Sequence, residues 1–305
     1  MIHGPLVSII IPTFNRRNLV GDAIKSVLSQ TYLDIEIIVI DDHSSDDTVE
    51  LIGQEFKKEI LEKKIILISN SRNERNAEAK NIGIRSASGT LIAFLDDDDV
   101  WLPKKLEIQV SSLENETADA CFCATSWVED GKILKQTLVR NNRISFENGC
   151  PTSTWLIRKE IFNKLGYFDP NIPTNDEGEL LVRLNKGGMK SVFVNEPLYI
   201  HYYHSQAVSH SRQGKQTGLI AILKKHKEVL NNYEKSSIYL KLAVLSLLAH
   251  KKAFTYTLKS LGARLSISGL VILILHLLPT SVAKLILNRT LDLQGYPHSF
   301  AERYN

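Results

Sequence analysis

Cysteine is scarce in this sequence, and its spacing fits neither a zinc site nor a disulfide framework. The 305 residues include three cysteines, Cys121, Cys123 and Cys150. There is no CxxC pair with a matching histidine spacing, and three cysteines are too few for a disulfide scaffold. Cys121 and Cys123 lie on a strand-like stretch, where alternate side chains share a face, so we expect them to pack in a core. A reducing, cytosolic compartment is therefore the expectation.

The sequence also lacks a clear targeting segment or membrane span. The N-terminal MIHGPLVSIIIPTFNRR has no basic n-region, and its apolar run stops at Pro12, which favours a first β-strand over a signal peptide. Residues 265–283 carry no Asp, Glu, Lys or Arg, but polar residues, a glycine and a proline shorten the apolar run below the roughly 20 residues that a span needs. A buried helical hairpin, a helix lying on an anionic membrane surface and a true span all stay open, and we favour the second.

The two parts of the chain carry charge of opposite sign. Residues 215–305 hold 13 Lys/Arg against 4 Asp/Glu, and the first 214 residues hold 24 against 30. The acidic part suits cation binding, and the basic part suits the anionic inner face of a cell membrane. The basic surplus lies in amphipathic stretches without interleaved aromatic residues, so nucleic acid is not an expected partner.

Apolar runs and helical patterns alternate along the first 117 residues. The expected strands lie at 6–11, 35–40, 64–68 and 90–95, and the expected helices at 17–29, near 46–56 and at 76–87. This alternation predicts an α/β fold with a mostly parallel sheet flanked by helices. Shorter strands and turns follow, with a helix at 179–186. We expect 118–214 to complete the same domain and 215–305 to form a helical extension.

Polar residues follow three of the predicted strands. They are Thr13, Asn15 and Arg16 after the first, Asp41 and Asp42 after the second, and Asp96 to Asp99 after the fourth. Ligands of such sheets bind beyond the carboxyl ends of the strands. We therefore expect these three clusters to converge.

The four consecutive carboxylates of Asp96–Asp99 are costly unless water or a cation compensates them. In an extended chain Asp96 and Asp98 would share a face and could hold a divalent cation that also takes phosphate oxygens. Asp99 is expected to precede a helix near Pro103, where negative charge is favourable. At the second cluster, Asp41 or Asp42 could accept hydrogen bonds from a nucleobase or ribose. An Asx turn into a helix capped by Ser45 or Asp46 is the alternative.

Four stretches in order, VSIIIPTFNR, IIVIDDHSSDDT, NAEAKNIGIRSASGTLIAFLDDDD and STWLIRKEIFNKLGYFD, resemble a family 2 glycosyltransferase with the GT-A fold. The ordered match runs from about residue 6 to 209. The resemblance implies a nucleotide diphosphate sugar as donor and Mg²⁺ or Mn²⁺ as cofactor.

The resemblance also implies roles for individual residues. Pro12, Thr13 and Asn15 would line the nucleotide pocket together with Arg16, and Asp42 or Asp41 would contact the base. Lys80 replaces the arginine of an A-R-N-x-G motif near the diphosphate, which keeps the charge but loses the bidentate fork. Asp96 and Asp98 match the outer acids of a DxD motif and Asp97 its middle residue. Asp98 is the expected metal ligand, and Asp96 would bind ribose or metal.

The family carries Glu-Asp before a helix that ends in Arg-Leu. Alignment on Arg183-Leu184 places Asp176 and Glu177 there in inverted order, so Glu177 takes the position of the general base and Asp176 competes with it. A helix cap with flanking acids is the alternative. His204 matches a histidine that contacts the diphosphate or the metal. Trp101 and Trp155 are expected to pack in the core.

The chain has no QxxRW motif, which in this family accompanies processive polymerisation. We therefore expect transfer of single sugars. The resemblance implies inversion and a hydroxyl acceptor. With the basic C-terminal part at the membrane, we expect the acceptor to be a saccharide or lipid-linked saccharide in cell-surface glycan synthesis at the cytoplasmic face. A sugar-1-phosphate nucleotidyltransferase is one alternative, but PTFNRRN lacks the glycines of its N-terminal loop. A non-catalytic nucleotide-sugar-binding membrane scaffold is the other, favoured only by the inverted acid pair.

Overall fold

The computed structural model describes residues 4–129, 131–137, 150–202, 212–248, 253–265, 270 and 272–273. The chain divides into two compact units. One comprises Met1–Asn171 and Asp176–Tyr203, and the other comprises Ile172–Asn175 and His204–Asn305. His204 and most of residues 265–283 lie outside the described residues.

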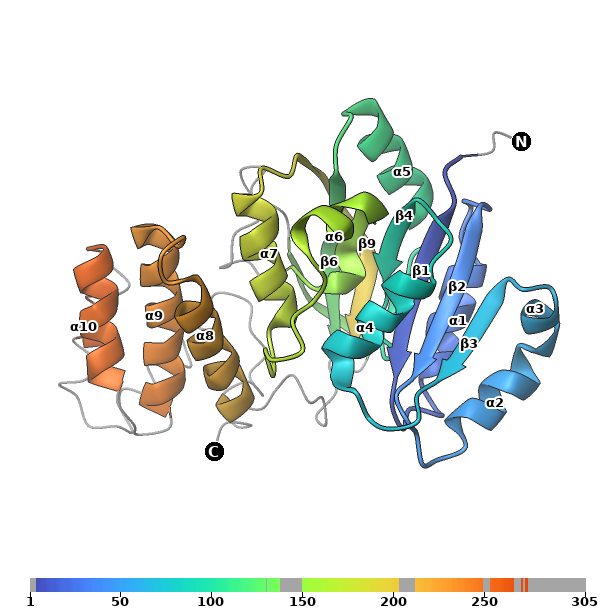
Figure 1. The fold of residues 1–305 in the computed structure, drawn as a ribbon, viewed down its shortest axis with the longest axis horizontal. Coiled ribbons are helices and arrows are strands. Elements are labelled where there is room, and N and C mark those ends of the chain that lie inside the picture. The colour runs from blue at the N-terminus through green and yellow to red at the C-terminus, as the bar shows by residue number, and fades with distance from the viewer. Residues whose placement is uncertain are drawn as a thin grey trace. The chain divides into compact units, whose positions relative to one another are not determined.

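A nine-stranded sheet forms the centre of the first unit (Figure 1). Its first half is parallel, in the order β3-β2-β1-β4. These strands are β1 (Val7–Thr13), β2 (Ile35–Asp41), β3 (Ile65–Ser69) and β4 (Leu91–Phe94). All seven residues of β2 are buried, as expected of a strand covered on both faces. The predicted parallel sheet is confirmed.

The second half of the sheet is mixed. The antiparallel strand β8 (Trp155–Arg158) pairs with β4 and with β6 (Ala120–Glu129), and β6 runs parallel to β9 (Ser191–Tyr202). At the margins, β5 (Val100–Trp101) pairs with β9 and β7 (Lys132–Thr137) pairs with β6. Because β5 is only two residues long, the sequence pattern gave no sign of it.

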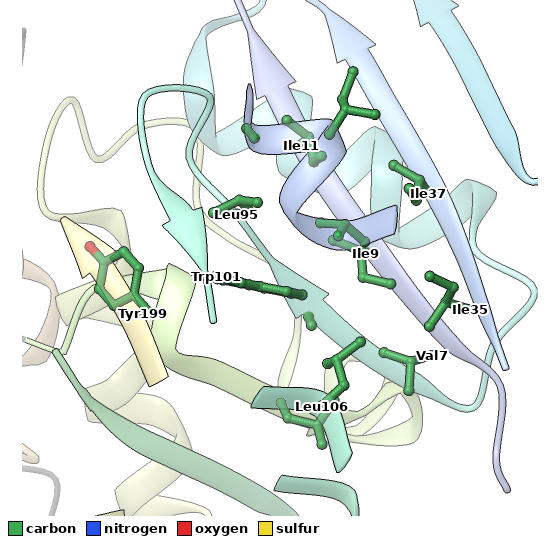
Figure 2. Packing of buried hydrophobic residues seen from close by; sticks show 14 of the residues in the cluster. Val7, Ile9, Ile11, Ile35, Ile37, Leu95, Trp101, Leu106 and Tyr199 are labelled. Carbon is green, nitrogen blue, oxygen red and sulfur yellow. The ribbon is translucent and has the colours of Figure 1, made fainter. Parts of the chain in front are cut away.

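Helices cover both faces of the sheet. On one face lie α1 (Val20–Leu28), α2 (Thr48–Glu55) and α5 (Lys105–Asn115), and α3 (Lys57–Leu61) leads into β3. Their apolar side chains pack with Ile9, Ile37 and Trp101 in one core cluster (Figure 2). On the other face lie α4 (Arg75–Ser86), α6 (Lys159–Leu165) and α7 (Asp176–Lys186), around Phe94, Phe122 and Trp155. Core positions are thereby confirmed for Trp101 and Trp155.

Two element boundaries differ from the expectation. Helix α7 begins at Asp176 rather than at residue 179, so the acid pair lies in its first turn, where the helix dipole favours negative charge. Strand β9 runs from Ser191 to Tyr202, twelve residues, and is thus longer than the short strands expected in this part of the chain. Cys121 and Cys123 are buried as expected, and burial raises the pKa of their thiols to about 12 and about 11.

The second unit contains α8 (Arg212–His226), α9 (Asn232–Leu248) and α10 (Ala253–Ala263). Helices α9 and α10 meet at small polar residues, where the Ser260 hydroxyl donates to the Ser236 carbonyl at 3.0 Å. Ile238 and Leu242 are buried, while Phe254 and Leu258 of α10 are about half exposed. Within the described part of the chain, no helix is both long and apolar enough to cross a membrane.

Candidate functional site

The acidic run forms a tight turn rather than the expected extended strand. The Asp99 amide donates to the Asp96 carbonyl at 3.2 Å, and Asp97 and Asp98 occupy the turn positions between them. The expectation that Asp96 and Asp98 alternate onto one face of an extended chain is therefore wrong. Instead, the guanidinium of Arg16 faces two carboxylates, at 3.9 Å from Asp97 Oδ1 and 4.0 Å from Asp98 Oδ2.

Burial and mutual repulsion make the turn electrostatically unfavourable. Burial, reinforced by the charges of Asp99 and Asp98 and opposed by Lys80, raises the pKa of Asp96 to about 7. Burial also raises the pKa of Asp97 to about 7, although the nearby Thr13 hydroxyl and Arg16 lower it. A cation that binds this turn would relieve the repulsion.

Asp99 has a different role from the expected helix cap. Its buried carboxylate accepts hydrogen bonds from the Tyr199 hydroxyl at 3.0 Å and from the Tyr202 amide at 3.1 Å. His201 Nδ1 lies 3.1 Å from the same carboxylate. Burial would lower the pKa of His201, but this contact with Asp99 outweighs it and raises the pKa. Asp99 thus fixes the end of β9 beside the acidic turn, and Lys104, not Asp99, precedes α5.

The loops after β1 and β2 are tied together by Asn15. Its side-chain oxygen accepts from the Ser45 backbone amide at 2.7 Å, and its backbone amide donates to the Ser44 hydroxyl at 2.8 Å. The Arg16 amide donates to Thr48 Oγ1 at 3.1 Å. Pro12 and Thr13 end β1 beside Ile40 and Asp41 of β2. Convergence of the first two clusters is confirmed, and Arg16 links them to the third.

Asp41 and Asp42 differ in how far their oxygens are used. Asp42 accepts from the Asn70 side chain at 2.9 Å and from the amides of Glu74 and Arg75 at 2.8 Å each. Asp41 accepts the Ser44 amide through Oδ2 at 3.2 Å. Its Oδ1 is buried without a hydrogen-bond partner among the described residues. Asp42 therefore fixes the entry to α4, and Asp41 retains a free acceptor.

Lys80 is fully engaged inside the protein. Its side chain is 2% exposed, and Nζ lies 3.0 Å from Asp176 Oδ2 and 4.7 Å from the centre of the Phe168 ring. Burial would lower the pKa of Lys80, but the carboxylates of Asp176, Asp96 and Glu177 outweigh it and raise the pKa. The ammonium thus links the acid pair electrostatically to the acidic turn.

Glu177 follows Asp176 in the first turn of α7. Burial and the charge of Asp176 raise the pKa of Glu177, and Lys80 opposes them. Asp176 is thus held by the ammonium of Lys80, while burial and the neighbouring carboxylate make Glu177 easier to protonate than an exposed glutamate.

The sequence interpretation missed several groups around this site. Ser153 Oγ accepts the Asp96 amide at 3.1 Å, and Tyr199 and His201 hold Asp99. Tyr199 and His201 alternate on one strand, a signal that became useful only once β9 was known to reach residue 202. In the described part of the chain, no group of three or more His, Cys, Asp or Glu side chains has the geometry to hold a metal ion.

Solved structures share this fold. The mannosyltransferase PcManGT from Pyrobaculum calidifontis, in complex with GDP-Man and Mn²⁺, is 16% identical with a TM-score of 0.65, covering 99% of this chain and 86% of that one. TarS residues 1–349 from S. aureus, in complex with UDP-GlcNAc, is 16% identical with a TM-score of 0.60, covering 98% and 91%. The mixed, mostly parallel sheet with helices on both faces is the GT-A fold.

Residues 8–172, more than half of the chain, match the family described as Glycosyl transferase family 2. The chain belongs to this family of sugar-transferring enzymes. The glucosyltransferase WfgD of Escherichia coli, described as UDP-Glc:alpha-D-GlcNAc-diphosphoundecaprenol beta-1,3-glucosyltransferase, is 32% identical over 53% of this chain and 64% of its own length. The putative teichuronic acid biosynthesis glycosyltransferase TuaG of Bacillus subtilis is 28% identical over 68% of this chain and 83% of its own. An uncharacterized glycosyltransferase of Rickettsia felis is 45% identical over 44% of this chain, which spans only 22% of that relative.

Proposed function

We propose that this protein transfers one sugar from a nucleotide diphosphate sugar to a hydroxyl group, with inversion, and that Glu177 is the general base. The observation that carries the proposal is the acid pair at the start of α7, in which Lys80 holds Asp176 and Glu177 keeps a raised pKa. A general base works best when its pKa lies near the operating pH. We assign donor binding to residues 1–117 and acceptor binding and catalysis to 118–214.

The donor nucleotide would bind at the loops after β1 and β2. The unpaired Oδ1 of Asp41 can accept an N–H of the base, a role that Asp42 fills less well because three donors already occupy its carboxylate. Pro12, Thr13 and Asn15 would line the pocket. Arg16, which stands beside Asp97 and Asp98, can meet the diphosphate.

The acidic turn fits a divalent metal in its chemistry. Carboxylate oxygens are the ligands that Mg²⁺ and Mn²⁺ prefer, and such ions need few protein ligands because phosphate oxygens and water supply the rest. Asp98, with Asp96, would hold the ion, and its positive charge would stabilise the departing nucleoside diphosphate. Burial, together with the charges of Asp99 and Asp98, raises the pKa of Asp96, and a cation bound at the turn would offset both effects. His204 lies outside the described residues, and its role at the metal or diphosphate stays a prediction from the resemblance alone.

The reaction would be a single displacement. The acceptor hydroxyl gives its proton to Glu177, and its oxygen forms a bond to the anomeric carbon. The bond from that carbon to the diphosphate oxygen breaks, and its electron pair leaves with the nucleoside diphosphate. Attack on the side opposite the leaving group inverts the configuration.

The relatives suggest which substrates to try first. WfgD is named for UDP-Glc and a GlcNAc-diphosphoundecaprenol acceptor, and WfaP of Escherichia coli, 41% identical over 36% of this chain and 42% of its own length, carries the same description. We propose UDP-glucose as the first donor to test and a lipid-linked saccharide in cell-surface glycan synthesis as the acceptor class.

A lipid-linked acceptor requires access to a membrane, and we propose that the helical extension supplies it at the inner face. Residues 215–305 are strongly basic, and α10 exposes Phe254 and Leu258, one helical turn apart. The double variant F254S/L258S should sediment less with vesicles that contain anionic lipid. I133S, which alters an exposed side chain of β7, is the matched control. Equal sedimentation of both variants with the native protein would contradict the proposal.

A donor-hydrolysis screen tests the enzymatic proposal. Purified protein is incubated with UDP-, GDP- and dTDP-sugars with Mn²⁺ or with EDTA, and release of the nucleoside diphosphate is measured. We expect one donor class to be turned over with Mn²⁺ and the rate to fall strongly in D98A. Metal-independent turnover unaffected by D98A would refute the metal assignment, and absence of turnover and of donor binding would refute the function.

A further inference from the structure

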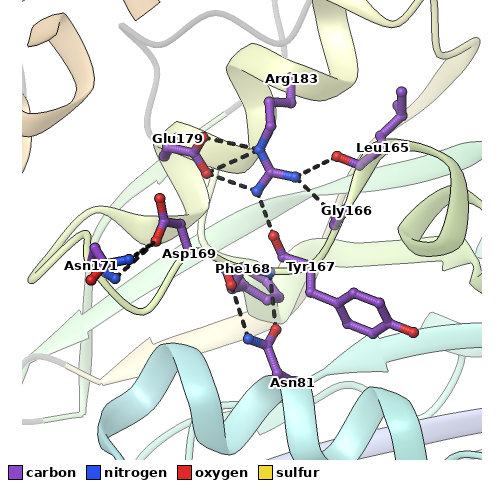
Figure 3. A network of polar contacts seen from close by, with 9 residues as sticks. All are labelled: Asn81, Leu165, Gly166, Tyr167, Phe168, Asp169, Asn171, Glu179 and Arg183. Atoms are coloured by element: carbon purple, nitrogen blue, oxygen red, sulfur yellow. Dashed lines mark hydrogen bonds and ion pairs between the residues drawn. The ribbon is translucent and has the colours of Figure 1, made fainter. Parts of the chain in front are cut away.

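Residues 165–168, at the end of α6, form hydrogen bonds with side chains from two other helices, α7 and α4 (Figure 3). From α7, Arg183 Nη1 donates to the carbonyls of Leu165 at 2.6 Å and Gly166 at 3.0 Å. Arg183 Nη2 donates to the Tyr167 carbonyl at 2.6 Å. The planar guanidinium thus donates to three carbonyls through two nitrogens at fixed positions, which the single ammonium of a lysine could not do.

The guanidinium is itself held in place. Glu179, one turn earlier in α7 and completely buried, accepts from Arg183 Nε at 3.0 Å and Nη2 at 2.8 Å. Because Leu165 and Gly166 lie at the C-terminal end of α6, the positive charge also stabilises the helix dipole there. Gly166 has a φ of +88°, and a Cβ at this position would lie 3.1 Å from Arg183 Nη1. Backbone conformation and close approach therefore both favour glycine.

From α4, Asn81 binds the other end of the segment. Its side-chain amide donates to the Phe168 carbonyl at 2.9 Å, and its side-chain oxygen accepts the Phe168 amide at 2.9 Å. This pair of bonds fixes the backbone of a buried residue. Asn81 is also the direct neighbour of Lys80 in α4.

Phe168 connects the segment to the acid pair. Its ring lies 4.7 Å from Lys80 Nζ and packs edge-on against Phe94 at 5.5 Å and stacked on Trp155 at 6.3 Å. The ring therefore limits where the Lys80 ammonium can lie. The ammonium in turn binds Asp176, seven residues before Arg183 in α7.

We propose that Arg183 and Asn81 are positioning residues for catalysis: by holding residues 165–168 between α4 and α7, they fix Lys80 against Asp176 and so place Glu177 for proton transfer. The inference rests on the proposed role of Glu177. It adds that the geometry of the acid pair depends on contacts made two helical turns away from it.

The test uses R183Q, R183K and N81A in the full chain, with R158Q as the matched control. Arg158 likewise binds a carbonyl, that of Ala118 at 2.9 Å, and a glutamate, Glu114 at 2.9 Å, but it pairs with the N-terminal end of β4, opposite the acidic turn. Thermal unfolding and the Kd for UDP with Mn²⁺ report folding and donor binding. The kcat–pH profile for UDP-glucose and carboxyl ¹³C NMR of labelled Glu177, assigned with E177Q, report the acid pair.

For folded R183Q we expect UDP affinity within about twofold of native. Because Lys80 is held less firmly, kcat should fall by at least about tenfold, and the titration of Glu177 should shift to higher pH by about half a unit. R183K should recover only part of kcat, and N81A should show the same pattern more weakly. R158Q should lower the melting temperature but leave UDP affinity, kcat and the Glu177 titration unchanged.

Native kcat and a native Glu177 titration in R183Q would overturn the inference, as would identical behaviour of R183Q and R158Q. If R183Q does not fold, the same criteria apply to R183K and N81A. Full activity of E177Q would instead refute the proposed base. The NMR titration tests the positioning of the pair even then, because it does not depend on turnover.

Discussion

Asp41 and Asp42 are adjacent in the sequence, but their carboxylates are used in opposite ways. Asp42 accepts three hydrogen bonds at the entry to α4, whereas Asp41 keeps a buried oxygen without a partner in the described part of the chain. A buried acceptor without a partner is costly, so a ligand that donates to it gains affinity. The two residues should therefore respond differently to the same substitution.

We expect D41N to weaken UDP binding by roughly tenfold while the melting temperature changes little. D42N should leave donor binding less affected but destabilise the fold by about 1–3 kcal/mol, because an amide cannot accept all three donors. Isothermal titration with UDP and chemical denaturation measure the two effects. The reverse pattern, with D42N losing affinity and D41N losing stability, would exchange the roles assigned here.

Lys80 and Lys105, both buried in the described part of the first unit, differ in their partners. Lys80 pairs with Asp176 at 3.0 Å. Lys105 instead bonds Gln109 Oε1 at 2.7 Å and lies over the Trp101 ring at 3.7 Å. Burial lowers the pKa of Lys105 to about 8. K80M should thus cost about 3–5 kcal/mol of unfolding free energy because it leaves Asp176 unpaired, whereas K105M should cost little at pH 7.

The lowered pKa of Lys105 also predicts a pH dependence. Below pH 8 both states carry the charge, and the cost of burying it is fully present. Between pH 8 and the ordinary value of 10.5, the folded state releases its proton first, so the unfolding free energy rises with pH. Denaturation curves should show this rise in the native protein relative to K105M. A constant difference between the two across this range would contradict it.

Catalysis should depend on pH through Glu177. Burial and the charge of Asp176 raise the pKa of Glu177. Only the deprotonated form of Glu177 can take the proton from the hydroxyl group of the acceptor. The kcat/KM for transfer should therefore increase as pH rises through the neutral range. In D176N the charge that raises this pKa is gone, so the increase should move to lower pH. An unshifted profile in active D176N would show that another group controls the rate.

The apolar runs at β1, β2 and β4 were long and regular enough to predict the parallel sheet and the edge where the polar clusters meet. Trp155 and Cys121 could be assigned to the core because their neighbours are apolar. Local sequence did not show the partners of Asp99 and Lys80, since Tyr199 and Asp176 lie 100 and 96 residues away. The start of α7 was missed because Asp176 and Gly178 have weak helix propensity, which the helix dipole and the bond from Lys80 to Asp176 offset.

The turn at Asp96–Asp99 was the most consequential error. Alternation in an extended strand requires that the strand continue, but β4 ends at Phe94 and the chain reverses into β5. That reversal is set by the pairing of β5 with β9, about 100 residues later. As a result, Asp97 and Asp98 lie opposite Arg16, and the predicted alternation of Asp96 and Asp98 onto one face is lost.

The most direct test of the proposed function compares E177Q with native protein in a transfer assay with UDP-glucose, Mn²⁺ and a GlcNAc-diphospholipid acceptor. Glutamine keeps the size of the side chain but cannot take a proton. We expect kcat to fall by about 10²–10⁴-fold while UDP affinity and melting temperature stay close to native. Native kcat in folded E177Q would contradict the assignment of Glu177 as the base.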